Sequence, residues 1–156
     1  WEHMPAGSGK EPSVHLALLP EVDSRWKDEN LAETWEKILN VRGEVTKALE
    51  EARSAKQIGH PLDAAVTISV QEDLYNLLQP YEEDFRFILI VSSVSLLKDE
   101  TLDGSFESEN LEGLSIKIEA ARGEKCERCW IHEMSVGSDS THPTICERCR
   151  KALMEI

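Results

Sequence analysis

The chain has 156 residues, 40% of them hydrophobic, and a formal net charge of −13. This suffices for one ordinary domain or two small ones, and no apolar run approaches the roughly 20 residues that a membrane span needs. The negative charge argues against a general nucleic-acid binder, which normally carries a basic patch. The charge is uneven, however: residues 1–121 hold 11 Lys/Arg and 24 Asp/Glu, whereas residues 122–151 hold 6 and 5. Any contact with phosphate is therefore expected near the end of the sequence.

The first residues, WEHMPAGSGKEPSVHL, contain no initiator Met and no basic region before an apolar stretch. They therefore lack the features of a secretory signal peptide. The Pro, Gly and Ser content of residues 5–12 favours a linker. We interpret residues 1–24 as a linker or extended segment that follows an upstream part of a longer chain.

A long amphipathic helix is predicted within residues 28–61. Asn30 and Glu33 fit a capping box at its start, and Gly59 and Pro61 mark its end. The helix should have about 25 residues and a length of about 37 Å. Its apolar residues recur with the helical gaps of three and four: Leu31, Trp35, Ile38, Val41, Val45, Ala48, Leu49 and Ala52.

Residues 61–121 predict a small α/β unit. Its elements follow from alternating or β-branched strand patterns and from two helical patterns that Pro80 separates. An acidic loop, residues 98–113, is expected to be solvated. With the long helix before this unit and a cysteine-rich segment after it, the fold class is α+β. Strands are expected at residues 64–70, 89–97 and 114–122, and helices at residues 71–79, 81–90 and 149–156.

All four cysteines lie in residues 122–156, in two Cys-x-x-Cys pairs with the spacing Cys-x2-Cys-x16-Cys-x2-Cys: Cys126, Cys129, Cys146 and Cys149. Each pair can direct two thiolates at one point, and the loop between them can bring both pairs to one ion. This suits tetrahedral Zn²⁺ with Zn–S distances of about 2.3 Å. Four thiolates leave no open coordination position, so one structural zinc per chain is predicted. Its binding would also supply folding free energy to a short polar segment.

Other interpretations of the cysteines stay open. Two disulfides would need an oxidising compartment, and nothing in the sequence indicates secretion. A thioredoxin-like redox pair would need only one Cys-x-x-Cys, whereas the spacing alone does not exclude a four-thiolate iron site. His132 and His142 lie between the pairs and could replace one thiolate, although solvated loop histidines are the simpler interpretation.

Basic and aromatic residues surround the two pairs. Cations neutralise phosphate and exposed aromatic rings stack on bases, so this composition fits a nucleic-acid contact. Trp130 could instead pack over the metal site, and the cations could merely balance the thiolate charge. The candidate binding residues are Lys125, Arg128, Trp130, Arg148, Arg150 and Lys151.

The order of these features resembles a known family. Residues 35–53 fit the frame W-x-x-[IL]-x-x-V-R-x-E-V-x-K-A-L-E-x-A-R, and residues 58–66 fit I-G-x-P-L-x-A-x-V. Both resemble the end of the anticodon-binding helical region of class I aminoacyl-tRNA synthetases for branched aliphatic amino acids. FILIVSSV resembles the strand that follows in isoleucyl-tRNA synthetases. KCERCW…VGSDSTHPTICERC resembles the zinc module at the C-terminus of the bacterial-type enzyme.

This resemblance implies a protein that activates isoleucine with ATP and transfers it to tRNA, with both small substrates bound outside this chain. Residues 25–60 would be the last helix of the anticodon-binding bundle, residues 61–121 a junction domain, and residues 122–156 the zinc module. The chain would bind the anticodon end of isoleucine tRNA. No catalytic residue is expected, because the family's motifs His-Ile-Gly-His and Lys-Met-Ser-Lys-Ser are absent from the sequence. Arg53 and Lys56 are further tRNA candidates, although solvation of the helix surface is the simpler interpretation.

Two other functions stay open. One is a zinc-stabilised module that binds protein through Trp26, Trp35 and Trp130. The other is the zinc module of formamidopyrimidine-type DNA glycosylases, which has a similar cysteine spacing after a different fold. Reduced thiols favour the cytoplasm, but an organellar enzyme of bacterial type would share these features. We expect a monomer without membrane contact.

Overall fold

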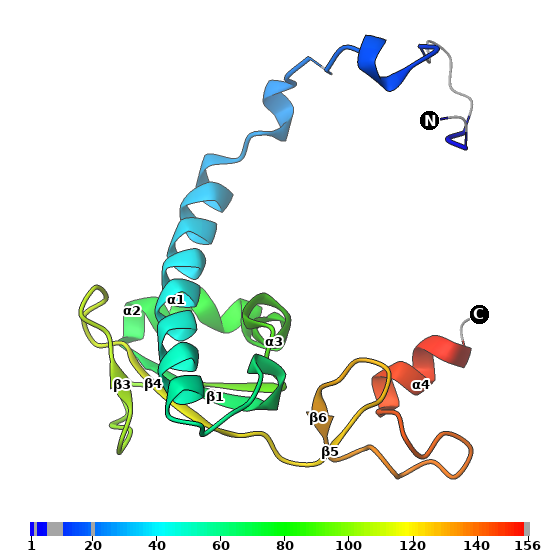
Figure 1. Ribbon diagram of the computed structural model, residues 1–156. Helices are drawn as coiled ribbons and strands as arrows, with labels where there is room; N and C mark the ends of the chain where they lie inside the picture. Colours follow the sequence, from blue (N-terminus) through cyan, green and yellow to red (C-terminus); the bar gives the residue numbers. More distant parts are fainter. Residues whose placement is uncertain (2, 6–10, 20, 155–156) are drawn as a thin grey trace.

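The computed structural model describes residues 1, 3–5, 11–19 and 21–154 (Figure 1). It confirms the α+β class: a long helix leads into a four-stranded sheet, and a separate two-stranded sheet and a short helix form the cysteine-bearing end. Residues 2, 6–10 and 20 of the predicted linker and the last two residues of the predicted C-terminal helix lie outside the described residues. Among the described residues, no helix is long and apolar enough to span a membrane.

The long helix, α1, spans Glu29–Ser54. The predicted capping box at Asn30 is wrong, because Asp28 is the N-cap and its carboxylate accepts a hydrogen bond from the backbone N–H of Leu31 at 2.9 Å. An Asp at this position satisfies a free N–H and also favours the positive end of the helix dipole. Before α1, the segment expected to be extended contains two short 3-10 helices, Val14–Leu16 and Ser24–Trp26.

The central sheet has the strand order β2-β1-β4-β3. β1 and β2 are parallel and joined by a helical crossover, whereas β4 is antiparallel to both β1 and β3. β1 coincides with the predicted strand, but β2 begins four residues later than expected because the chain first completes α3. The strands are β1 (Ala64–Val70), β2 (Ser93–Lys98), β3 (Phe106–Glu107) and β4 (Ser115–Ala120).

The crossover consists of α2 (Glu72–Leu78), a 3-10 helix (Gln79–Asp84) and α3 (Phe85–Leu89). Pro80 lies between the two α-helices, as predicted, but in the first turn of the 3-10 helix that joins them, where its missing N–H would have no intrahelical partner. The chain therefore stays helical from residue 72 to residue 89. It leaves α3 through Ile90, whose φ of 58° is left-handed.

One face of the sheet packs against the helices, because alternate residues of β1 enter the core. The first nine residues of α1 contain no buried side chain, and this N-terminal part of the helix extends beyond the sheet (Figure 1). The best-buried residues of the core are Ile38, Val41, Val45, Ala64, Val66, Ile68, Val70, Leu78, Phe85, Val91, Leu114 and Ile116.

The acidic loop between β2 and β4 is more ordered than predicted. It contains β3 and is anchored to α1 by Glu44, which is only 5% exposed. The Glu44 carboxylate accepts hydrogen bonds from Ser108 Oγ at 2.8 Å and Asn110 Nδ2 at 3.0 Å, and pairs with Lys47 Nζ at 2.6 Å. The loop residues themselves remain mostly exposed, as expected for an acidic segment.

Candidate metal centre

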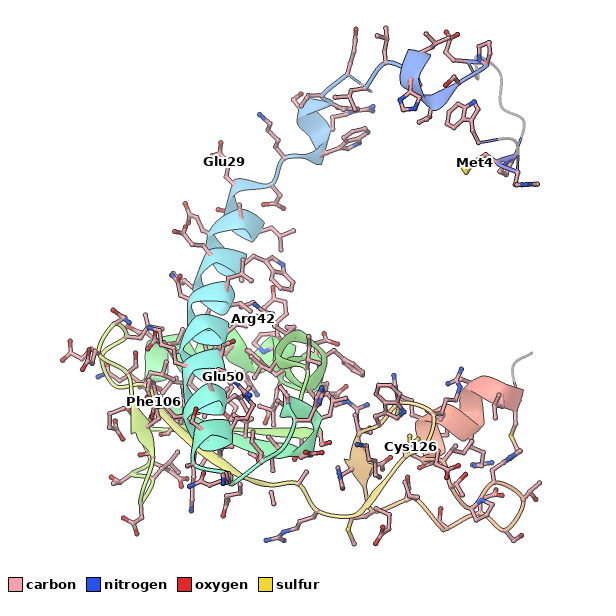
Figure 2. All side chains as sticks on the ribbon, viewed as in Figure 1. Met4, Glu29, Arg42, Glu50, Phe106 and Cys126 are labelled. Carbon is pink, nitrogen blue, oxygen red and sulfur yellow. The ribbon has the colours of Figure 1, made fainter. Side chains whose placement is uncertain are left out.

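The cysteine module, residues 122–154, is built from a hairpin and a helix. β5 (Glu124–Lys125) pairs with β6 (His132–Glu133), and α4 spans Glu147–Met154. The first cysteine pair lies on the turn that joins β5 to β6. Cys146 immediately precedes α4 and Cys149 lies in its first turn, so the second pair comes from a helix start. Cys126 lies between the hairpin and α4 (Figure 2).

The four sulfur atoms form one cluster. All four Sγ atoms lie within 4.8 Å of one another, and those of Cys129 and Cys146 are 3.7 Å apart. Four sulfurs at about 2.3 Å from a tetrahedral zinc would be about 3.8 Å apart, whereas a disulfide bond needs about 2.05 Å. All four thiols are free. The geometry therefore suits one tetrahedral metal ion and does not fit two disulfides, and neither His132 nor His142 belongs to the cluster.

Backbone hydrogen bonds hold the first pair in place. The N–H of Trp130 donates to the carbonyl of Cys126 at 2.8 Å, and the N–H of Cys126 donates to the carbonyl of Ile131 at 2.9 Å. Trp130 has a left-handed φ of 66°, which closes this turn. The N–H of Cys146 points at the sulfur of Cys126 at 3.3 Å. The second pair is thus linked directly to the first.

These contacts and burial shift the pKa values of three of the four thiols. Burial raises the pKa of Cys126, but backbone N–H groups of Cys129, Cys146 and Arg128 outweigh it and lower that pKa to about 6. Burial raises the pKa of Cys146 to about 12 and also raises the pKa of Cys129. The protein alone therefore favours the thiolate of Cys126 and disfavours those of Cys129 and Cys146. A divalent cation is the kind of group whose charge would stabilise the others.

The module has its own small core, which also contacts the α/β unit (residues 61–121). Ile131 is buried with the cysteines, and Leu62, from the 3-10 helix Pro61–Asp63, packs against this cluster. The His132 ring places Nδ1 3.1 Å from the Gly123 carbonyl and Nε2 3.5 Å from Asp63 Oδ1. The cysteine cluster is thus docked on the α/β unit.

The structure separates the predicted nucleic-acid residues into two groups. Three are paired with carboxylates: Arg53 with Glu50 at 2.6 Å, Lys151 with Glu147 at 2.9 Å, and Arg150 with Asp139 at 3.6 Å. Such surface pairs are weak and exchange readily. The others have no carboxylate within 4.0 Å among the residues that the structure describes, namely Lys56, Lys125, Arg128 and Arg148. Trp130 is 60% exposed and does not belong to the module's core.

Sequence reasoning missed Arg86 and Phe87. Arg148 of the cysteine module lies over the ring of Phe87, with its Cζ 5.3 Å from the ring centroid, and Arg86 lies over the same ring at 4.6 Å. Phe87 lies in a segment predicted only to be helical, residues 81–90, and the composition of that segment gave no indication of a binding site. Only the docking of the module on α3 brings these three side chains together.

Known proteins match this chain both in the cysteine module and beyond it. Residues 123–152 match the family model described as "Zinc finger found in FPG and IleRS". The isoleucine–tRNA ligase of Geobacter sulfurreducens is 48% identical over 153 residues, which is 98% of this chain and 16% of that protein. Those of Moorella thermoacetica and Carboxydothermus hydrogenoformans are 39% and 42% identical over 158 and 156 residues, which is 100% of this chain and 17% and 16% of those proteins.

The zinc-finger model by itself fits both protein classes in its description, FPG and IleRS. The similarity to isoleucine–tRNA ligases distinguishes between them, because it extends beyond the cysteine module through α1 and the central sheet. The chain spans only 16–17% of the length of these relatives. Over its whole length, the chain is therefore similar to one part of isoleucine–tRNA ligases, and its cysteine module matches the zinc-finger model.

Proposed function

We propose that this chain is the C-terminal, tRNA-binding part of an isoleucine–tRNA ligase and holds one structural Zn²⁺ on Cys126, Cys129, Cys146 and Cys149. The observation that carries the proposal is the cluster of four sulfurs with tetrahedral spacing, in a chain similar over its whole length to isoleucine–tRNA ligases. The full enzyme would attach isoleucine to its tRNA at the expense of ATP. ATP and isoleucine would bind outside this chain, which contributes binding rather than catalysis.

The RNA contact is proposed at the cysteine module. Its sequence is close to neutral within a chain of net charge −13, so it repels phosphate less than the rest. Arg128, Lys125 and the exposed Trp130 provide cations and a stacking surface near the metal cluster. Proteins that recognise RNA specifically select unstacked loop bases, which suits an anticodon loop. Such a contact far from the acceptor end would help to position the tRNA.

The long helix and the α/β unit would connect this contact to the rest of the ligase. We propose that residues 25–60 complete a helical bundle and that residues 61–121 form a junction domain. The exposed apolar residues toward the N-terminal end of α1, Leu31, Trp35 and Leu39, support this arrangement. Contiguous apolar surface of this kind is typical of a protein–protein contact. Four free thiols suit a reducing space such as the cytoplasm, and we propose that the protein acts there as a monomer.

A tRNA titration at several salt concentrations tests the RNA contact. The 156-residue chain should bind isoleucine tRNA with an affinity that falls as salt rises. Trp130→Ala should weaken binding roughly 5- to 150-fold. Arg128→Gln should reduce the salt slope by about 1. Trp26→Ala and Arg25→Gln, which alter exposed residues of the N-terminal segment, are the matched controls.

Two results would contradict the proposal. Binding that is undetectable at low salt would favour the interaction module without RNA. Equal effects of the variants and their controls would show that the cysteine module is not the contact surface.

A further inference from the structure

A pocket of about 230 Å³ lies where α3 meets the cysteine module. It is smaller than the roughly 300–1,000 Å³ of sites for drug-sized ligands, so it suits one small planar group. Both parts of the chain contribute to it: Leu62, Arg86, Phe87, Ile90 and Val91 from the α/β unit, and Cys129, Ile131 and Arg148 from the module.

Two cations from different parts of the chain meet at one aromatic ring in this pocket. Phe87 is 50% exposed although it is a large apolar side chain. Arg86 approaches its ring from the same helix at 4.6 Å, and Arg148 approaches from α4 at 5.3 Å. Cation–π attraction holds guanidinium groups in such positions. The result is a surface of stacked planar groups with positive charge.

Neither arginine is paired with a carboxylate, although Arg148 interacts with the Cys129 thiolate, which raises the pKa of Arg148. Among the described part of the chain, Arg86 and Arg148 have no carboxylate within 4.0 Å, although acidic residues outnumber basic ones by 30 to 17. A guanidinium has five N–H donors, so contact with a ring, and for Arg148 also with the Cys129 sulfur, leaves several of them free. An anionic partner is the chemistry that would use them.

The edge of the pocket carries two unusual backbone conformations. Ile90 lines the pocket, is 53% exposed and has a φ of 58°. A left-handed β-branched residue is rare, and Gly would end α3 at lower cost. Trp130, also left-handed and exposed, lies in the chain between the pocket residues Cys129 and Ile131. Strain of this kind is concentrated at binding sites.

We infer that this pocket binds one unpaired base of single-stranded RNA, stacked against Phe87, with the adjacent phosphates on Arg86 and Arg148. The inference rests on the proposed tRNA-binding function and extends it to the α/β unit. Bases stack on aromatic rings and on guanidinium planes alike, and both are present here. The RNA surface is then shared by two parts of the chain, and the docking of the module creates it.

Binding of isoleucine tRNA and of a seven-nucleotide RNA with its anticodon-loop sequence to the zinc-loaded chain tests this inference. Phe87→Leu should weaken binding about tenfold and leave the salt slope unchanged, because no charge is lost. Phe87→Trp should retain binding. Arg86→Gln should lower the salt slope by about 0.7. Trp26→Leu and Arg25→Gln serve as controls, and equal melting temperatures would show that the variants are folded.

Several outcomes would overturn the inference. Normal binding by Phe87→Leu, together with weakened binding by Trp130→Ala, would remove this pocket and leave the proposed function intact. Equal loss in Phe87→Leu and Phe87→Trp would also exclude stacking. A polyglutamate peptide that competes as well as the RNA would identify a general anion site. An unmodified chain that binds neither RNA would defeat both this inference and the proposed function.

Discussion

The hydroxyl group of Ser92 joins the α/β unit to the cysteine module. Its Oγ accepts a hydrogen bond from the backbone N–H of His132 at 2.7 Å and donates one to the carbonyl of Leu62. Ser92 is only 4% exposed, so water cannot readily replace it. A residue outside the cysteine motif therefore contributes to the orientation of the cysteine cluster on the α/β unit.

Ser92→Ala should loosen this docking. The change leaves the His132 N–H and the Leu62 carbonyl without a partner, which costs roughly 1–3 kcal/mol when such groups are buried. Amide hydrogen exchange in residues 122–133 should accelerate, while zinc content stays unchanged because no sulfur is altered. Ser93→Ala, at the exposed first residue of β2, is the control. Equal exchange in the two variants would show that the Ser92 hydroxyl does not hold the module.

Gly123→Ala should damage the module more than Gly137→Ala. Both glycines have a left-handed φ, of 89° and 88°, so both substitutions incur the same backbone cost of about 1–2 kcal/mol. At Gly123, however, a Cβ would lie 2.4 Å from the carbonyl carbon of Glu133, whereas nothing lies within 4 Å at Gly137. Thermal unfolding should therefore occur at a lower temperature in Gly123→Ala. Matching melting temperatures would refute the proposed clash.

Glu44→Gln should lower stability more at neutral pH than in acid. The hydrogen bond from Lys47 lowers the pKa of Glu44 from its ordinary 4.5, and the donors Ser108 and Asn110 add to this against the effect of burial. The ionised carboxylate therefore stabilises the fold above pH 4.5, and this contribution is lost as the pH falls through the lowered pKa.

Urea unfolding at pH 7 and pH 3 measures this effect. At pH 7, Glu44→Gln should lose roughly 1–3 kcal/mol of unfolding free energy, and the loss should shrink at pH 3. Glu36→Gln, at an exposed position of α1, should have little effect at either pH. A loss of the same size at both pH values would show that the charge of Glu44 is not what matters.

Removal of the metal should unfold the cysteine module and leave the sheet folded. The two parts have separate buried clusters, one around β1 and α1 and the other around the cysteines. The smaller cluster would lose the roughly 10–16 kcal/mol of apparent free energy that structural zinc supplies in zinc-finger peptides. Hydrogen exchange after chelation should therefore rise in residues 122–154 and stay slow in β1. Loss of protection in β1 as well would show that the two parts fold as one unit.

Local sequence signals predicted a large part of this fold. The apolar period of α1 and the alternation in β1 are visible in a single segment, because each element buries one face. The spacing of the four cysteines likewise predicts the four candidate metal ligands. Each of these features depends on residues close in the sequence, or on one residue type with specific chemistry.

Features that depend on packing were not predictable in the same way. Asp28 and Asn30 are both good N-caps, so the local sequence does not decide between them, and the structure places Asp28 at this position. Ser92 has no partner in its own segment. Phe87 and Arg148 come together only when the cysteine module docks, so no local pattern connects them.

Zinc content and tRNA binding, measured on the same sample before and after chelation, test the account most directly. We expect one Zn²⁺ per chain. We also expect binding of isoleucine tRNA that weakens as salt rises and is lost when the metal is removed. Two results would contradict it. One is a chain without metal whose four cysteines are oxidised under native conditions, and the other is tRNA binding that is the same with and without zinc.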